Sequence, residues 1–468
     1  PLLTLYTSHD DVVRLDLVRS RHAEFGSPIK EIVDVPEATR HEMASAALAP
    51  QAVDPVVALM LRFVRMVVIV ASPVHAAPPH AAPLHPAPAR RLLLISFDGF
   101  RADYIGRPAA KRLRELAARG VRAERLRPAF PTKTYPNHYT IVTGLYPAHH
   151  GIVANTIWDS SLGGFDMGDN PAERDARWWW GEPIWVTAEK QGMRAASYFW
   201  PGSDAEIDGV RPHWYYQWDA TVSRAERVRK VLEWLAMPAD SAPRMITTYF
   251  AETDGAGHNY GPGAPQVDAA IAQVDSVLGA LVDGIARLGL TDAVDLMVVS
   301  DHGMAPARGA NAIALDDFVS LDSLRVVDWT PVTAIIAKPG AEAYVYDRLH
   351  GAHPKFDVWR KAELPARFHY DGARVAPIIG LAAEGWIVSS RARLARSPPR
   401  VSGGEHGYDN DLPSMQALFV AAGPSFRRGV TAPSLDMIHL YPLMAQILGL
   451  RPAKTDGSLD SVRALLRP

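Results

Sequence analysis

The sequence predicts an α/β protein built on a mostly parallel sheet. From Arg91 onward, short apolar runs alternate with amphipathic segments, the pattern expected when helices join parallel strands. Acidic and His residues recur where the apolar runs end, which is the edge at which open α/β sheets place their ligands. The chain has 468 residues, 48% hydrophobic and 21% charged. This length and composition allow one large domain or two smaller ones with a sizeable core.

Each expected element follows from the local pattern. Residues 92–97 are a strand candidate, and residues 111–119 have helical apolar spacing before a stop at Gly120. Residues 245–250 and 294–300 are further buried strands. Between them lies an expected helix, whose apolar face is formed by Val267, Ile271, Val274, Leu278, Leu281 and Ile285. Residues 417–422 return to the strand pattern, and residues 437–448 are expected to form a closing helix.

The chain ends and one internal region depart from this pattern. Residues 1–59 have no sustained periodicity, and we expect them to be a non-native or disordered extension. Residues 60–76 are typical of a bacterial signal peptide, because Arg62 and Arg65 precede an apolar stretch too short for a permanent membrane span. Residues 77–90 are an Ala/Pro/His linker. The catalytic domain is expected over residues 91–458, with an insertion or lid at about 305–400 and a tail at 459–468.

Charge and cysteine content narrow the classes of ligand. The formal net charge of −2 provides no basic field for a nucleic-acid polymer, so a nucleotide ligand is expected to be small. The chain has no cysteine, which excludes thiolate metal sites and cysteine nucleophiles. His and carboxylate side chains remain as the strong metal ligands. The oligomeric state stays open.

Candidate metal ligands follow successive strands. Asp98 follows the first strand, Asp254 and His258 the second, and Asp301 and His302 the third. A further candidate, His406, lies in a Gly-rich stretch, and imidazole and carboxylate are ligands that zinc accepts. Alone, the Asp301 cluster could be a polar turn, and Asp254 with His258 a helix cap with a surface His. Their recurrence after apolar strands favours one shared metal site.

Longer motifs extend along the chain. They are the segment from Phe130 to Asn155 and the stretches Glu182-Pro183-Ile184-Trp185, Tyr198-Phe199-Trp200-Pro201-Gly202, Asp254-Gly255-x-Gly257-His258, Asp301-His302-Gly303-Met304 and His406-Gly407-Tyr408-Asp409-Asn410. These motifs resemble the nucleotide pyrophosphatase/phosphodiesterases, a branch of the alkaline phosphatase superfamily. The segment from Phe130 to Asn155 is similar to that family's nucleophile motif, and the similarity spans residues 92 to about 457. The resemblance implies an alkaline-phosphatase-like sheet flanked by helices on both faces, with a smaller inserted subdomain. Without the extra modules of animal relatives, we expect a minimal bacterial form.

The resemblance also implies roles for individual residues. Thr134 matches the nucleophile, because it directly precedes Tyr135-Pro136-Asn137-His138, and Asn155 matches a donor to a phosphate oxygen. Tyr135 and Tyr249 match positions that sandwich a nucleotide base, whereas core packing is the alternative for both. Two zinc ions are implied, one held by Asp254, His258 and His406, and the other by Asp98, Asp301, His302 and the Thr134 oxygen.

The implied reaction is zinc-dependent hydrolysis of phosphodiester or pyrophosphate bonds in nucleotides. It passes through a phospho-threonine intermediate and releases a nucleoside monophosphate. A phosphomonoesterase is an alternative, since Lys133 could reach the phosphate. A phospholipid-headgroup phosphodiesterase is another, if Trp178, Trp179 and Trp180 formed a choline cage, although packing is the preferred role for them. A noncatalytic zinc-binding protein is disfavoured by the intact motifs. The signal-like segment predicts a periplasmic or secreted enzyme.

Overall fold

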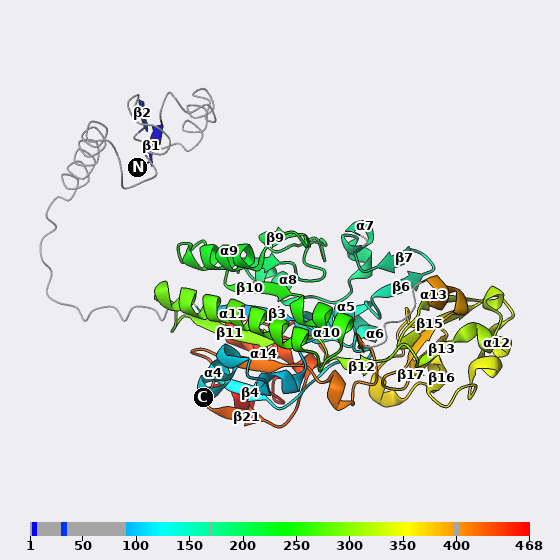
Figure 1. The fold of residues 1–468 in the computed structure, drawn as a ribbon. Helices are drawn as coiled ribbons and strands as arrows, with labels where there is room; N and C mark the ends of the chain where they lie inside the picture. Colours follow the sequence, from blue (N-terminus) through cyan, green and yellow to red (C-terminus); the bar gives the residue numbers. More distant parts are fainter. Residues whose placement is uncertain (1, 7–29, 35–89, 169, 397–402) are drawn as a thin grey trace, which may run out of the picture. The chain divides into compact units, whose positions relative to one another are not determined.

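The computed structural model describes residues 2–6, 30–34, 90–168, 170–396 and 403–468 (Figure 1). The chain divides into two compact units, residues 1–84 and 85–468. In the first unit, strands β1 (Leu2–Tyr6) and β2 (Lys30–Asp34) pair in parallel. The rest of the expected 1–59 extension, the signal-like residues 60–76 and linker residues 77–89 lie outside the described residues.

An eight-stranded mixed sheet forms the centre of the second unit. Its middle strand, β3, pairs in parallel with β10 on one side and with β11 on the other. Beyond β11 the sheet continues through β20, which is antiparallel to both β11 and β4. The strands in spatial order are β21 (Val430–Ala432), β4 (Val121–Ala123), β20 (Phe419–Ala422), β11 (Val294–Val299), β3 (Arg91–Phe97), β10 (Met245–Phe250), β8 (Ala195–Tyr198) and β9 (Trp214–Tyr216).

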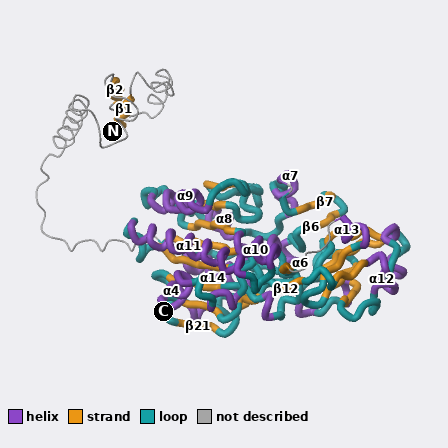
Figure 2. The backbone as a smooth tube through the Cα atoms, in the orientation of Figure 1, coloured by secondary structure: helices purple, strands orange, loops and turns teal. Residues whose placement is uncertain are grey.

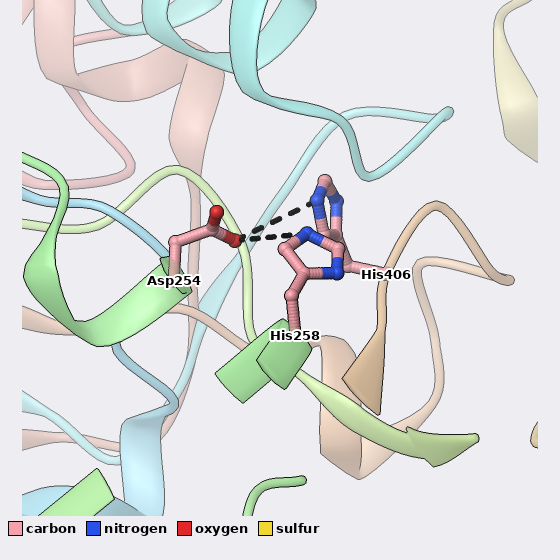
Figure 3. Close-up of side chains that lie close together, drawn as sticks. All are labelled: Asp254, His258 and His406. Atoms are coloured by element: carbon pink, nitrogen blue, oxygen red, sulfur yellow. Dashed lines mark ion pairs between the residues drawn. The ribbon is translucent and has the colours of Figure 1, made fainter. Parts of the chain in front are cut away.

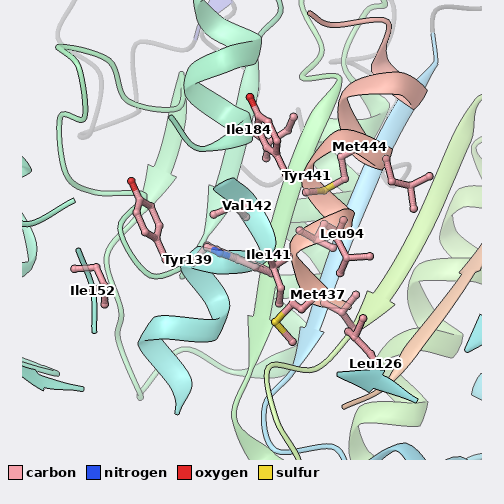
Figure 4. Packing of buried hydrophobic residues seen from close by; sticks show 14 of the residues in the cluster. Leu94, Leu126, Tyr139, Ile141, Val142, Ile152, Ile184, Met437, Tyr441 and Met444 are labelled. Atoms are coloured by element: carbon pink, nitrogen blue, oxygen red, sulfur yellow. The ribbon is translucent and has the colours of Figure 1, made fainter. Parts of the chain in front are cut away.

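Helices cover both faces of this sheet, as the ribbon and the tube coloured by secondary structure show (Figures 1 and 2). Successive side chains of a strand point to opposite faces, so Leu92 and Leu94 enter one hydrophobic core and Leu93 and Ile95 enter the other. The first core receives α5 (Thr134–Thr143), α8 (Ile184–Lys190) and α14 (Leu440–Leu448), and Figure 4 shows part of its packing. The second receives α4 (Lys111–Arg119), α9 (Arg224–Ala236) and α11 (Pro265–Arg287).

The predicted fold class is confirmed. Helix α4 and strand β10 have the expected bounds, and β3 and β11 differ from expectation by one residue at one end. All six residues of the expected apolar face of α11 are buried. Among the described residues, α11 alone is long and apolar enough to cross a membrane, but more than half of its apolar window is buried inside the domain. It is therefore a core helix of this domain.

A second, antiparallel sheet lies within residues 305–400. Its strands, in spatial order, are β14 (Leu324–Asp328), β15 (Val332–Ala337), β17 (Ile378–Ala382) and β16 (Phe356–Arg360). Helix α12 (Glu342–Leu349) packs on this sheet, and together they enclose a third hydrophobic core. The region therefore folds around a core of its own beside the central sheet. Near the chain end, Val462 and Leu465 are buried, so part of the expected tail packs on the domain.

Candidate active site

The central sheet brings the candidate metal ligands to one edge. Asp98 directly follows β3, and Asp301 with His302 follows β11. Strand β10 leads into α10 (Glu252–Tyr260), which carries Asp254 and His258 one turn apart. Because β10, β3 and β11 are adjacent and parallel, their carboxyl ends meet at the same edge.

Asp254, His258 and His406 form the first group of converging side chains (Figure 3). Asp254 Oδ1 lies 3.4 Å from His258 Nε2 and 3.6 Å from His406 Nε2. His406 comes from a distant part of the sequence, directly after β19 (Gly403–Glu405). Three potential ligand atoms therefore face a common point.

Asp98, Asp301 and His302 form the second group, and all three are fully buried. His302 Nε2 lies 2.9 Å from Asp301 Oδ2 and 3.6 Å from Asp98 Oδ1. The Thr134 hydroxyl oxygen, Oγ1, lies 3.3 Å from the same nitrogen. The rings of His302 and His406 stack with centroids 3.6 Å apart, so the two groups are neighbours.

Backbone carbonyls fix the orientation of the three imidazole rings. The Nδ1 atom of His302 donates to Gly303 O at 2.9 Å, and that of His406 donates to Thr132 O at 2.9 Å. His258 Nδ1 donates to Gly404 O at 3.0 Å. A carbonyl can only accept, so Nδ1 carries the proton and a neutral ring turns the lone pair of Nε2 toward the carboxylates. Outer hydrogen bonds of this kind are typical of metal-ligating histidines.

The carboxylates of the site have unpartnered oxygens, and the pKa values of ionisable groups at the site are shifted. Asp98 Oδ1, Asp254 Oδ1 and Asp301 Oδ2 are among the few described buried side-chain oxygens that lack a hydrogen-bond partner of good geometry. Burial raises the pKa of the Asp98 carboxyl well above its usual range, and the charges of Asp301 and Asp254 raise it further. Burial also lowers the pKa of His406, with the neighbouring His302 and His258 adding to the effect, so its ring is neutral.

These observations fit divalent metal ions. Each group offers three ligand atoms, all within 4.8 Å of one another. A cation bound between the unpartnered carboxylate oxygens and the neutral His406 nitrogen would satisfy these converging acceptors. Nitrogen and carboxylate oxygen donors without thiolate suit zinc and other borderline divalent ions.

Thr134 is the first residue of α5, next to the second group. In the first turn of α5, Tyr135 N donates to Asn155, Asn137 N donates to Lys133 O at 3.2 Å, and Pro136 has no N–H. Thr134 N is therefore the N–H of this turn that a phosphate placed here would meet. Asn155 Oδ1 accepts a hydrogen bond from Tyr135 N at 3.0 Å. This bond orients the amide, whose Nδ2 atom is its donor.

A cavity of about 360 Å³ adjoins Thr134. Tyr135 and Tyr249, the two expected base-binding residues, both line it. Tyr249 donates its hydroxyl to Asp98 Oδ2, and Tyr135 donates to Glu173. The aromatic side chains that line the cavity are Tyr135, Phe199, Trp200, Tyr216, Trp218 and Tyr249. The cavity therefore offers stacking surfaces beside the candidate nucleophile.

Several cavity residues were not predicted from the sequence. Phe199 and Trp200 lay in a matching motif, but no role followed from the pattern. Trp218 lies in an irregular stretch without periodicity, and the sequence contains no signal that would have identified it. Glu173 accepts hydrogen bonds from the Tyr135 hydroxyl and from Gly168 N, the latter at 2.8 Å, so it fixes the Tyr135 ring.

Lys133 and the tryptophan tract at residues 178–180, on which the two alternative phosphatase and phospholipid functions depended, make structural contacts instead. Lys133 is buried and forms an ion pair with Asp328 of the second sheet. Trp178 and Trp179 are buried in the first core, and Arg374 lies over the rings of Trp178 and Trp180. This packing agrees with the preferred structural role for the tryptophan tract, none of which lines the described cavity.

A substitution at Gly303 would test whether the position of His302 depends on the close packing of the neighbouring backbone. A Cβ atom at Gly303 would lie 2.0 Å from Ser414 O, and Gly303 N already donates to Met415 O at 3.0 Å. We expect Gly303→Ala to displace His302, lower the content of bound divalent metal and reduce turnover by about 100-fold. Metal analysis of the purified variant checks this.

Gly255 provides the matched control. It lies between Asp254 and His258, yet a Cβ atom there would meet no heavy atom within 4 Å. Gly255→Ala is therefore expected to keep wild-type metal content. Equal losses in the two variants would contradict the assignment of the effect to the contact with Ser414.

A comparison with protein-family models matches residues 92–409 to the family described as type I phosphodiesterase / nucleotide pyrophosphatase. The chain belongs to this family. Among curated phosphodiesterase relatives, bis(5′-adenosyl)-triphosphatase enpp4 of Xenopus laevis is 37% identical over 381 residues, covering 80% of this chain and 81% of the relative. Human ectonucleotide pyrophosphatase/phosphodiesterase family member 5 is 34% identical over 379 residues, covering 81% of this chain and 78% of the relative.

Solved phosphodiesterase structures agree with this assignment. Murine ectonucleotide pyrophosphatase/phosphodiesterase 5, an inactive threonine-to-alanine variant in complex with AMP, has 36% identity and a TM-score of 0.76. It matches 81% of this chain and 100% of its own. This protein is thus a hydrolytic enzyme of the phosphodiesterase family. The relatives named here are vertebrate proteins, so they give no support for the expected bacterial, minimal form.

Proposed function

We propose that this enzyme hydrolyses phosphodiester or pyrophosphate bonds in small nucleotides and releases a nucleoside monophosphate. The observation that carries the proposal is the position of Thr134. Its hydroxyl borders the second Asp/His group, and its side chain also lines the aromatic cavity. A phosphate at Thr134 would therefore have the attached nucleoside beside stacking surfaces.

Thr134 is the proposed nucleophile. Its hydroxyl proton passes to water, and Oγ1 forms a bond to phosphorus while the bond from phosphorus to the leaving oxygen breaks, so that the leaving group departs with that oxygen into solvent. Water then cleaves the resulting phospho-threonine ester and regenerates the hydroxyl. The backbone N–H of Thr134 and the Asn155 amide are the proposed donors that stabilise negative charge on the phosphoryl oxygens. The inactive threonine variant of the murine relative supports this role.

The two Asp/His groups are the proposed holders of two zinc ions. Asp254, His258 and His406 would bind one ion, and Asp98, Asp301 and His302, with the Thr134 oxygen, would bind the other. Bound zinc would supply Lewis acidity, which lowers the pKa of the threonine hydroxyl and favours negative charge on phosphate oxygens. The proposal relies on the donor types, the converging Nε2 atoms and the orphaned carboxylate oxygens.

The proposed substrate has an organic group on each side of the phosphate. Tyr135 and Tyr249 would contact the base, and stacking tolerates several bases. Relatives named bis(5′-adenosyl)-triphosphatase support dinucleoside polyphosphates as one such class. The ion pair of Lys133 with Asp328 disfavours a phosphomonoesterase, because that cation is already neutralised. We also propose that the enzyme acts outside the cytoplasm, as the names of the ectonucleotide relatives suggest.

The test compares thymidine 5′-(4-nitrophenyl phosphate) with 4-nitrophenyl phosphate, using zinc-loaded enzyme. We expect kcat/KM for the diester to exceed that for the monoester by at least about tenfold, because the cavity contributes binding only to the nucleoside. Diadenosine triphosphate is assayed in parallel for release of AMP. A preference for the monoester would overturn the proposed substrate class.

A further inference from the structure

We infer that Arg227 is a positioning residue, which holds Trp218 and Tyr249 in place as one wall of the cavity and so sets the affinity for the nucleoside. The inference rests on the proposed function. It concerns a residue outside the site, since Arg227 is not among the described residues that line the cavity. Its influence must therefore act through its neighbours.

Arg227 connects three parts of the fold. It lies in the first turn of α9, is 4% exposed, and donates from Nη1 to Tyr249 O at 2.9 Å. From Nη2 it donates to Val222 O at 3.2 Å. One planar guanidinium thus joins strand β10, where Tyr249 lies, to the loop that follows Trp218. A fork of donors in fixed geometry suits this double contact better than the single ammonium of a lysine.

The same guanidinium lies among aromatic rings. Its Cζ atom is 5.8 Å from the ring centroid of Trp218, 5.6 Å from that of Phe199 and 5.0 Å from that of Phe250. Distances within about 6 Å favour cation–π attraction, which strengthens when the cation is desolvated. Phe199 and Trp218 line the cavity, whereas Phe250 lies in the second core behind it.

Trp218, at the exposed edge of this cavity wall, has few other contacts among the described residues. Trp218 is 46% exposed, and its described ring contacts are edge-to-face, with Tyr249 at 5.4 Å and with Phe199 at 5.2 Å. An exposed ring on an irregular loop loses rotamer entropy when it is fixed to bind a base. Arg227 reduces that loss on binding, because it orders the ring before the substrate arrives.

The position of Arg227 predicts a selective kinetic effect. Removing the guanidinium should weaken binding of the base in the ground state and the transition state alike, which raises KM with little change in kcat. A substrate without a base should be unaffected. A residue with a merely structural role would instead lower turnover of every substrate.

The experiment uses zinc-loaded Arg227→Met, which keeps a long side chain but removes the charge and the donors. Arg227→Lys keeps the charge but loses the planar fork of donors, and it is the second variant, should the first fold poorly. Arg224→Met is the matched control, because Arg224 lies one turn earlier on α9 and has no described aromatic contact. Arg224 pairs with Glu252 Oε1 at 3.2 Å, and Arg227 Nη2 lies 3.9 Å from the same oxygen, so both variants weaken the pairing of Glu252 and only Arg227→Met removes the aromatic contacts. The substrates are thymidine 5′-(4-nitrophenyl phosphate) and methyl 4-nitrophenyl phosphate, which has no base.

For Arg227→Met we expect KM for the thymidine ester to rise about tenfold, in line with a desolvated cation–π contact. We expect kcat/KM for the methyl ester to stay within about twofold of wild type, as for a contact that acts only on the base. Arg224→Met should match wild type with both esters. Equal losses with both esters in Arg227→Met, or no change with either, would overturn the inference.

Calorimetric titration with AMP separates this inference from the proposed function, since it requires no turnover. Weaker AMP binding in Arg227→Met than in wild type and Arg224→Met supports the role of Arg227 even if neither ester is hydrolysed. In that case the proposed function alone would fail. Unchanged AMP affinity in Arg227→Met would overturn the inference.

Discussion

Replacing Thr134 by alanine is expected to reduce hydrolysis of the thymidine ester by about 10³-fold or more, the scale seen when a nucleophile is removed. Thr134→Ala deletes the only atom of this residue that can form the covalent ester, while the helix N-terminus and the cavity remain. The variant should therefore still bind AMP. Steady-state kinetics with the thymidine ester, together with AMP titration, measure the two properties separately.

Thr132 and a conservative replacement provide the controls. Thr132 lies two residues earlier, and its hydroxyl donates to Tyr408 O at 3.0 Å and accepts from Gly407 N at 3.0 Å, so it has structural partners. Thr132→Val removes two neutral hydrogen bonds, each worth about 1 kcal/mol of stability, but no group that can attack phosphorus, so it should retain turnover within about tenfold of wild type. Thr134→Ser keeps a hydroxyl and should keep measurable activity. Full activity in Thr134→Ala would remove Thr134 from the mechanism.

Removal of metal is expected to have the second largest effect. Dialysis against a chelator should abolish turnover, and the apoprotein should melt at a lower temperature than the zinc-loaded enzyme. The two buried carboxylates of Asp98 and Asp301 and the half-buried carboxylate of Asp254 belong to the two groups, and an ion that binds only the folded state stabilises it by mass action. Activity and thermal unfolding are followed before and after zinc is added back.

Substitution of one proposed ligand at a time shows which group binds each zinc ion. His406→Ala should lower the zinc content of the purified enzyme by one equivalent at the first group, and His302→Ala by one equivalent at the second. His439, which is outside both groups and donates no ligand atom to either, is the control position, and His439→Ala should keep both equivalents. Zinc content that is unchanged in His406→Ala and His302→Ala would contradict the ligand assignment.

Local pattern predicted the sheet and the convergence of Asp and His side chains at its edge, whereas the family resemblance implied their division into two groups. Strand β10 and helix α4 have strong periodicity, and ligands that end parallel strands must converge at one edge. Thr134 was indicated by the family resemblance, because it directly precedes the matching run Tyr135-Pro136-Asn137-His138. The structure adds a physical reason to expect a bound cation, because the Nε2 atoms and carboxylate oxygens converge. The residue types alone did not supply that reason.

The parts that were not predicted depend on tertiary contacts. The sheet at residues 324–382 is antiparallel, and its register is set by packing and turns that have no simple period. Trp218 lies on a loop, and Arg227 is a charged residue on an amphipathic helix, where exposure is the usual expectation. The contact of Arg227 with the rings of Phe199 and Trp218 arises only in the folded structure.

The covalent intermediate tests the central claim most directly. Zinc-loaded enzyme is mixed with the thymidine ester, quenched with acid within the first turnover, digested and analysed by mass spectrometry. The account predicts a thymidylyl group on Thr134 that is absent from Thr134→Ala. Active enzyme that carries the group on another residue, or that shows no adduct although product forms in a burst, would contradict it.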